Sequence, residues 1–114
     1  MGKKGEELAL HFLKSSGYTI LERNFRYGRG EIDIVARDVD TIAFVEVKSR
    51  SSNEFGAPEE AVGVRKQKQL SRLARAYLQQ KRLLYRIDCR FDVVAISFQT
   101  NTIRLIKNAF PSTC

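Results

Sequence analysis

The alternation of apolar and polar residues predicts two adjacent β-strands in the first half of the chain. Segments 30–35 and 43–48 are rich in β-branched and aromatic residues, and their charged residues recur at every second position. The polar segment 38–41 between them predicts a hairpin turn. A hairpin centred on residues 39 and 40 places Asp38 opposite Thr41, and this fixes the register of both strands.

Four charged side chains converge in this register. It places Asp33 opposite Glu46 and Glu31 opposite Lys48, and opposed residues share one face of a sheet. Opposed carboxylates repel each other, and in strands this apolar the repulsion favours a bound cation such as Mg²⁺, which takes oxygen ligands. The alternative interpretation is that these charges point into solvent from a half-exposed sheet.

The apolar residues of the strand pair favour the site over the solvent-exposed face. In the expected register, Val35 and Phe44 share the face of the charged side chains. The opposite face holds four further apolar residues: Ile32, Ile34, Val45 and Val47. A sheet that is apolar on both faces is expected to be covered on both.

Apolar residues at helical spacing predict a first helix over residues 3–16, ended by Gly17. Its apolar stripe consists of Leu8, Ala9, Leu10, Phe12 and Leu13. Helical geometry turns Glu6 inward and Glu7 outward. The inward Glu6 has two interpretations, since it can interact with the free amides and dipole of the helix start or reach a metal site on the sheet.

A second amphipathic helix is predicted over residues 64–82, with a basic outer face. Its buried stripe consists of Leu70, Leu73, Ala74, Tyr77 and Leu78, and its outer face carries Arg65, Lys68, Arg72, Arg75 and Arg82. Eight Lys or Arg residues and no acid lie between Ala61 and Ile87. A charged face is commonly a solvated surface, but a face of one sign favours nucleic-acid binding.

Lys66 lies on the side of this helix that faces the core, one turn before Leu70. Two interpretations follow from that position. The lysine can extend out to solvent along the apolar surface, or it can point into the site on the sheet and contact a phosphate.

Three further strands are predicted over residues 18–25, 90–98 and 102–106, and Arg90 and Asp92 are expected to pair. A basic turn over residues 26–30 carries Arg26, Tyr27 and Arg29 and suits phosphate contact and base stacking, although an ordinary hairpin loop explains it as well. Residues 49–56, including Arg50, predict a polar loop beside the site, and residues 58–60 predict a helix start. The order of elements predicts a single α/β domain over residues 1–114, with a mixed sheet flanked by helices.

Composition narrows the possible chemistry. The formal charge of +7 favours polyanion partners such as nucleic acid. A single histidine, His11, leaves no basis for a Ser-His-Asp triad or a His-Cys zinc site. Cys89 and Cys114 are expected to be free thiols in a reducing cytoplasm. With no apolar run long enough for a bilayer and no signal peptide, a soluble cytoplasmic protein without a membrane partner is expected.

These segments resemble the YraN family of small bacterial proteins, within the PD-(D/E)XK, or restriction-endonuclease-like, superfamily. The superfamily pattern is an acidic residue followed by Glu-x-Lys on the next strand, and here it matches Asp33 and then Glu46, Val47 and Lys48. The family resemblance extends over residues 5–9, 17–18, 23–24, 30–33, 44–50, 55–56, 60–62, 66, 76–78, 90–94 and 106–110. Ile32 stands where the superfamily commonly has proline, a departure that removes no ligand.

The resemblance implies a three-layer sandwich with a central sheet of about five strands, and a predicted endonuclease distantly similar to archaeal Holliday junction resolvases. It implies Mg²⁺ or Mn²⁺ as the cofactor, with catalytic residues Asp33, Glu46, Lys48 and Glu6. The metal ligands would be Asp33, Glu46, Glu6 and the Val47 carbonyl, and Glu31 would pair with Lys48. DNA contacts are expected from Lys66, Arg65, Lys68, Arg72, Arg75, Arg26, Arg29 and Arg50.

The expected function is therefore metal-dependent hydrolysis of DNA, with branched DNA as a substrate implied by the resemblance alone. Symmetric cutting of two strands would need a homodimer. The alternative is a nucleic-acid-binding module that keeps the fold without cleaving. A third interpretation is a subunit whose basic helix docks an acidic protein.

Overall fold

The computed structural model describes residues 2–50 and 62–111 and places the elements in the predicted order. They are α1 (Gly2–Ser15), β1 (Thr19–Tyr27), β2 (Gly30–Asp38), β3 (Thr41–Arg50), α2 (Val64–Gln80), β4 (Asp88–Ser97) and β5 (Thr102–Phe110). Ser49 and Arg50, expected in a loop, instead complete β3. The rest of that loop and the helix start at residues 58–60 lie outside the described residues.

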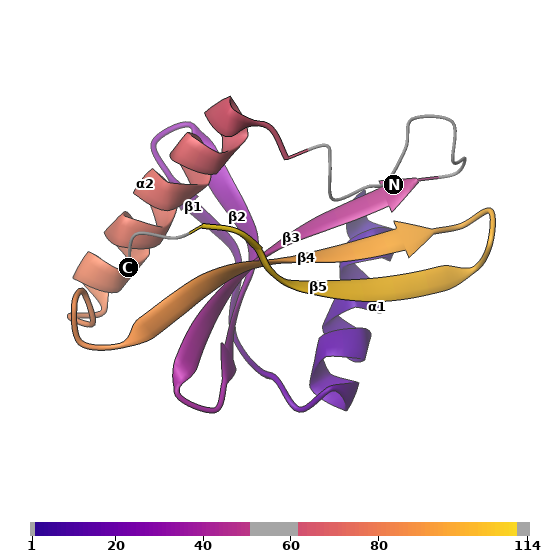
Figure 1. Ribbon diagram of the computed structural model, residues 1–114, viewed down its shortest axis with the longest axis horizontal. Helices are drawn as coiled ribbons and strands as arrows, with labels where there is room; N and C mark the ends of the chain where they lie inside the picture. Colours follow the sequence, from indigo (N-terminus) through magenta and orange to yellow (C-terminus); the bar gives the residue numbers. More distant parts are fainter. Residues whose placement is uncertain (1, 51–61, 112–114) are drawn as a thin grey trace.

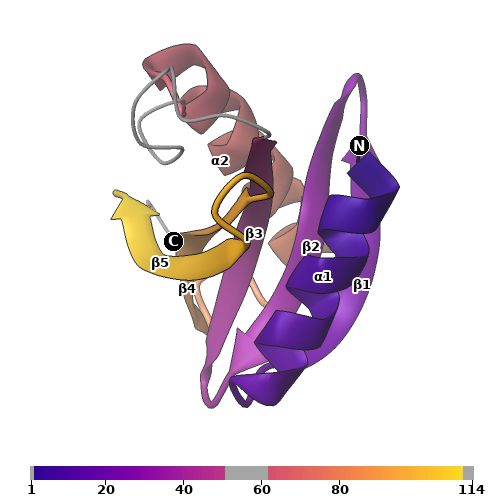
Figure 2. The same cartoon turned by 90° about the vertical axis from the view of Figure 1, so that its right-hand side faces the viewer.

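The five strands form one mixed sheet in the order β1-β2-β3-β4-β5 (Figure 1). β3 and β4 pair in parallel, whereas the other neighbours pair antiparallel. Parallel neighbours need a crossover connection, and α2 lies in it. Figure 2 shows α1 against one face of the sheet and α2 on the other side. The predicted α/β fold, a mixed five-stranded sheet between helices, is confirmed.

Each face of the sheet has its own hydrophobic core, built from the stripes that helical periodicity predicts. On one face α1 buries Ala9, Leu10 and Leu13 against residues of β2, β3 and β4, among them Ile34, Val45 and Val94. On the other face α2 buries Leu70, Leu73, Ala74, Tyr77 and Leu78 against residues that include Phe25, Val35, Phe44 and Phe91. The sheet is therefore covered on both faces, as the apolar pattern of its central strands predicts.

The predicted register of β2 and β3 holds over part of the hairpin and then ends. Asp38 lies opposite Thr41, and the pairing continues to Ile34 opposite Val45. Ile32 does not share a face with Ile34 as expected, because Ile32 packs in the core under α2 and Ile34 in the core under α1. Asn24 on β1 faces this interruption and has a left-handed φ of 53°.

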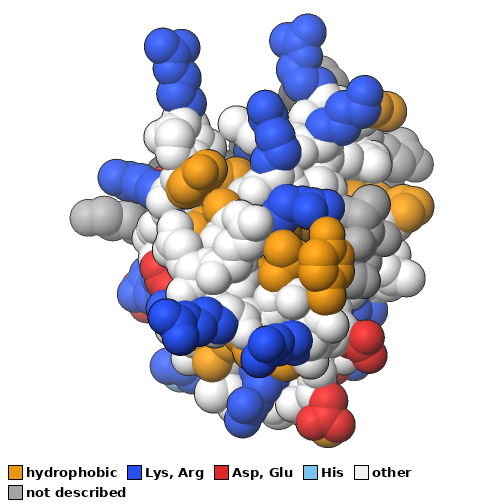
Figure 3. Space-filling view, turned by 90° about the vertical axis from the view of Figure 1, so that its left-hand side faces the viewer, with side chains coloured by type: hydrophobic (Ala, Val, Ile, Leu, Met, Phe, Trp, Pro, Cys, Tyr) orange, Lys and Arg blue, Asp and Glu red, His pale blue; other side chains and the backbone are white. Residues whose placement is uncertain are grey.

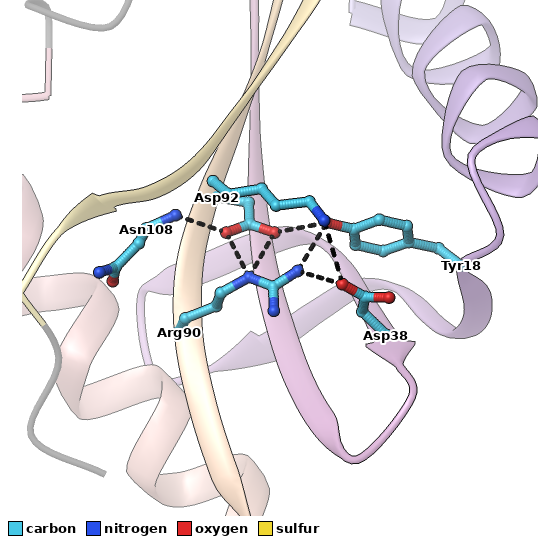
Figure 4. Close-up of polar contacts among 6 residues, drawn as sticks. Tyr18, Asp38, Arg90, Asp92 and Asn108 are labelled. Carbon is cyan, nitrogen blue, oxygen red and sulfur yellow. Dashed lines mark hydrogen bonds and ion pairs between the residues drawn. The ribbon is translucent and has the colours of Figure 1, made fainter.

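A second polar cluster lies near the β2–β3 turn and joins distant parts of the chain (Figure 4). The fully buried Asp92 carboxylate accepts hydrogen bonds from the Tyr18 hydroxyl, Arg90 Nε and the Asn108 backbone N–H. Arg90 also donates to Asp38 at 2.7 Å. The predicted pair of Arg90 and Asp92 is thus confirmed, and the buried charge is neutralised within the network.

One prediction from composition is wrong. Cys89 is disulfide-bonded rather than a free thiol, so the cysteine argument for a reducing compartment no longer holds. Sequence spacing could not indicate this, because the antiparallel pairing of Phe91 with Phe110 is what brings the end of β5 beside the start of β4. Cys114 lies outside the described residues. No helix in the described part of the chain is long and apolar enough to cross a membrane.

Candidate active site

Asp33 and Glu46 lie side by side where the pairing of β2 with β3 ends. The pairing of β2 with β3 ends at Ile34 and Val45. Next to it, Asp33 Oδ2 accepts a hydrogen bond of 2.8 Å from the backbone N–H of Val47. Glu46 is only 6% exposed, although it carries a carboxylate. A buried carboxylate needs partners that compensate its charge, and two lysines provide them.

Two lysines surround Glu46 on the side of the sheet that faces α2. Lys66 of α2 places its Nζ 3.3 Å from Glu46 Oε2, and Lys48 of β3 places its Nζ 4.0 Å from the same oxygen. Of the two interpretations of Lys66, the structure favours the one in which it points into the site. The basic helix is thereby tied to the acidic strands at this point.

Glu6 and Glu31 approach Asp33 on the side of the sheet that faces α1. One carboxylate oxygen from each of the three residues lies within 4.8 Å of the others. The Asn24 side chain donates to Glu6 at 3.1 Å and to Glu31 at 2.8 Å, and so links α1 to β2. Glu6 therefore reaches the site rather than only its own helix start, while Glu7 points outward to Arg23.

The expected contact between Glu31 and Lys48 is absent among the described contacts of the two residues. Glu31 instead accepts hydrogen bonds from Asn24 and Arg26, and Lys48 lies beside Glu46. The Asn24 side chain, which donates to both Glu6 and Glu31, holds Glu31 on the side of α1 instead. Glu31 still lies with Asp33, as the register predicts, and joins Glu6 and Asp33 in one carboxylate group.

The electrostatics of Asp33 reflect its position between these groups. Burial, together with the negative charge of Glu46, raises the pKa of Asp33 to about 7, while the hydrogen bond from Val47 opposes the rise. Negative charge is therefore in excess around Asp33. Such an excess is what a divalent cation bound to carboxylate oxygens would relieve.

The predicted basic outer face of α2 is exposed. Figure 3 views the molecule from the side of α2 and shows Lys and Arg side chains spread over this face, with hydrophobic groups between them and acidic groups mainly toward the edge. Its basic residues include Arg65, Lys68, Arg72 and Arg75, all exposed. Arg26 and Arg29, in and beside the β1–β2 turn, are also exposed, and Arg50 at the end of β3 is half-buried.

The sequence pattern missed two residues that the fold brings to this region, Asn24 and Gln69. Asn24 organises the carboxylates, and its only signal was an asparagine inside a predicted strand, a residue that tolerates left-handed backbone. Tyr27 and Gln69 line a hollow between the β1–β2 turn and α2. Only the packing of the helix on the hairpin brings these two together.

The donor set of the site suits a hard cation. Carboxylates from Asp33, Glu46, Glu6 and Glu31 offer oxygen ligands, which Mg²⁺ and Mn²⁺ accept. Lysine ammonium groups beside the carboxylates and arginines on the adjacent helix suit a phosphate group. Together these groups can hold a cation and a phosphodiester next to each other.

Comparison with known proteins gives a consistent family. Residues 5–96 match the model of a family described as "Uncharacterised protein family UPF0102". A "UPF0102 protein" of Syntrophus aciditrophicus is 53% identical over 96% of this chain and 87% of its own length. Similar proteins of Acetivibrio thermocellus and Caldicellulosiruptor saccharolyticus are 50% and 46% identical, each over 96% of this chain and over 89% and 96% of their own lengths.

Proposed function

The chain belongs to the uncharacterised protein family UPF0102, the YraN family. Since that description names no activity, we propose the function from the site: the protein is a metal-dependent DNA endonuclease that hydrolyses phosphodiester bonds. The family predicted from the sequence is thereby confirmed, whereas the activity is our proposal. The observation that carries it is the convergence of Asp33, Glu46 and Lys48 beside a basic helix.

The metal would be held by Asp33 with Glu6 and Glu31, whose carboxylate oxygens lie together, and Glu46, beside Asp33 but outside this group, would be a further oxygen donor. A divalent ion bound there supplies positive charge to the phosphate and lowers the pKa of a water molecule. The Val47 N–H fixes the Asp33 carboxylate before any ligand arrives, and Asn24 does the same for Glu6 and Glu31. Such pre-organisation reduces the cost of assembling the site.

The lysines act on the substrate. Lys48 is close enough to Glu46 to orient the attacking water and to stabilise negative charge on the phosphate. Lys66 lies within reach of Glu46 and on the helix that carries the basic face, so it can hold the phosphate next to the carboxylates. The exposed arginines and lysines of α2 then bind the neighbouring backbone without reading sequence.

Cleavage of a labelled DNA panel tests this proposal. Linear duplex, single strand, flap and four-way junction are incubated with Mg²⁺, Mn²⁺ or EDTA, and the wild type is compared with Glu46→Gln. We expect metal-dependent cutting that falls at least 100-fold in the variant, since the change removes a charged ligand while keeping the size of the side chain. Cutting of equal rate in both proteins would refute the assignment of Glu46.

The same experiment addresses the alternative of a binding module. That function is favoured by the contacts of Glu46 with Lys66 and Lys48, which already compensate its charge. It predicts salt-sensitive binding of the DNA panel by both proteins and no cutting with either metal ion.

The endonuclease proposal also bears on the location and assembly of the protein. It requires a compartment that contains DNA, which for a bacterial protein is the cytoplasm. Symmetric cutting would further require two copies of the chain.

A further inference from the structure

A hollow of about 290 Å³ lies between the β1–β2 turn and α2, outside the carboxylate site. Tyr27, Gly28, Arg29 and Gly30 form one wall, and Gln69, Arg72 and Leu73 of α2 form the other. Its lining combines an aromatic ring, two guanidinium groups and an amide. Among the described residues, no acidic side chain lines it.

The hollow depends on close packing between the hairpin and the helix. A Cβ atom at Gly30 would lie 2.8 Å from Leu73 Cδ1 and 3.1 Å from Gln69 Nε2, so glycine permits this approach. The strand residues Tyr27 and Gly30 are paired in the ladder of β1 and β2, and Leu73 is buried in the core. Both walls are thus fixed by the fold, and the space between them is pre-formed.

The groups that line the hollow are available for a ligand. Tyr27 is 55% exposed, one of the most exposed large hydrophobic residues of the described chain, and its ring stacks on no other described ring. Arg29 and Arg72 are exposed and form no ion pair with another described residue. An unstacked aromatic ring and two guanidinium groups without ion pairs, lining one hollow, suit a base and its neighbouring phosphates.

Both walls continue directly into the candidate active site. On the hairpin, Gly30 precedes Glu31, whose carboxylate belongs to the metal-binding group. On the helix, Gln69 lies one turn after Lys66, which contacts Glu46. A nucleotide in the hollow would therefore be a near neighbour of the phosphate at the carboxylates.

We propose that this hollow holds the base of one unpaired nucleotide of a DNA substrate, stacked on Tyr27, while Arg29 and Arg72 contact the phosphates beside it. A paired base has both faces covered and its edge engaged, so an unpaired or branched position reaches the hollow at lower cost than continuous duplex. The inference rests on the proposed endonuclease function and names the class of its substrate, which is DNA with unpaired nucleotides next to the cut.

Binding of two matched DNAs tests the proposal. One duplex carries a single unpaired adenosine, the other an abasic residue at the same position, and affinities are measured by fluorescence anisotropy in EDTA so that no cleavage occurs. The wild type should prefer the adenosine roughly 10-fold, the scale of one base stacked on an aromatic ring. Tyr27→Leu should lose this preference, whereas Tyr27→Phe, which keeps the ring, should retain it.

A second pair of variants separates stacking from phosphate contact. Arg29→Gln and Arg72→Gln should weaken binding of both DNAs by the same factor, because phosphates are present in each. An equal affinity of the wild type for the two DNAs, or a preference that survives in Tyr27→Leu, would overturn the proposal.

The outcome is distinguishable from failure of the endonuclease itself. If the adenosine preference depends on Tyr27 but the protein shows no cutting that depends on Glu46, the hollow binds an unpaired base and the proposed catalytic function is wrong. If cutting depends on Glu46 but the wild type binds both DNAs equally, the endonuclease function is supported and the proposed role of the hollow is wrong.

Discussion

At the scale of single residues, Asp33 is the carboxylate whose negative charge is unfavourable in the folded protein. Its carboxylate is pinned by the Val47 N–H and flanked by Glu46 on one side and by Glu6 and Glu31 on the other. Clustered carboxylates lower the free energy of unfolding while no cation is bound, because their charges repel each other, and a bound cation raises it. This gives Asp33 a signature in stability as well as in activity.

Asp33→Asn should stabilise the protein at alkaline pH in a buffer with EDTA. Because the pKa of Asp33 is raised to about 7 in the fold, its ionisation opposes folding increasingly as pH rises from about 4 toward 7. The variant should gain about 2 kcal/mol in the free energy of unfolding at pH 8, and the gain should shrink toward zero near pH 4. Denaturant unfolding at several pH values measures it.

Asp40→Asn is the matched control, since Asp40 is an exposed carboxylate in the β2–β3 turn. It should change the free energy of unfolding by less than about 0.5 kcal/mol at either pH. A loss of stability in Asp33→Asn at pH 8 would contradict the account of the site.

The sequence predicted part of this site for a clear reason. Asp33, Glu46 and Lys48 could be identified from alternation and register, because a hairpin turn fixes which residues oppose each other. The place of Glu31 beside Asp33 was also expected, but its partners were not, because Arg26 and Asn24, a residue with left-handed backbone on the neighbouring strand, take the place of Lys48. Such a conformation is a property of the folded strand pair, and local composition only permits it.

At the scale of elements, α2 performs two tasks with two faces. One face buries Leu70, Leu73 and Tyr77 against the sheet, and the other exposes a row of basic residues next to the carboxylates. Lys66 lies between the two faces and contacts Glu46. The helix thus connects the exposed basic face to the carboxylate cluster, as the proposed function requires.

Neutralising the outer face of α2 should weaken DNA binding in a salt-dependent way. In the double variant Arg65→Gln/Lys68→Gln, the slope of log K against log salt should become shallower by about 1.8, since each phosphate that the protein neutralises adds about 0.9 to the slope. Fluorescence anisotropy in EDTA between about 50 and 200 mM KCl measures the slope.

Lys14→Gln, at the exposed end of α1 on the other side of the sheet, serves as the control and should leave the slope unchanged. Identical slopes for the wild type and the double variant would show that α2 does not face the nucleic acid.

Both helices were predictable because an apolar stripe with a period of 3.6 residues survives packing unchanged. The strands were predicted too short, most clearly β5, which continues beyond Ile106 through the polar Lys107 and Asn108 to Phe110. Their strand conformation comes from pairing with β4, which periodicity does not contain.

At the scale of the whole molecule, the two ends of the sheet have different tasks. The carboxylates lie where β2 and β3 separate, and the Asp92 network lies near the β2–β3 turn, about 17 Å of strand away. That network joins Tyr18, which directly precedes β1, to the β2–β3 hairpin and the last two strands (Figure 4). Burial and the charge of Asp92 raise the pKa of Tyr18 to about 12, so its hydroxyl remains a hydrogen-bond donor even in alkaline solution near pH 10.

Asp92→Ala should destabilise the protein by about 3–5 kcal/mol, since it leaves Arg90 without its buried partner and the Asn108 N–H without an acceptor. Lys107→Gln, at the exposed margin of the same network, should cost less than about 0.5 kcal/mol. Thermal and denaturant unfolding compare them. A cost below about 1 kcal/mol for Asp92→Ala would mean that the network does not hold the fold together.

The measurement that tests the central claim most directly is the rate of DNA cleavage against Mn²⁺ concentration for the wild type and Asp33→Asn, with DNA binding followed in parallel. The variant is expected to be at least as stable at pH 8, so a fall in activity cannot be attributed to unfolding. The account predicts cleavage that saturates with Mn²⁺ in the wild type, at least a 100-fold lower rate in the variant, and similar DNA affinity in both. Equal rates with the same dependence on Mn²⁺, or no metal-dependent cleavage by the wild type, would contradict it.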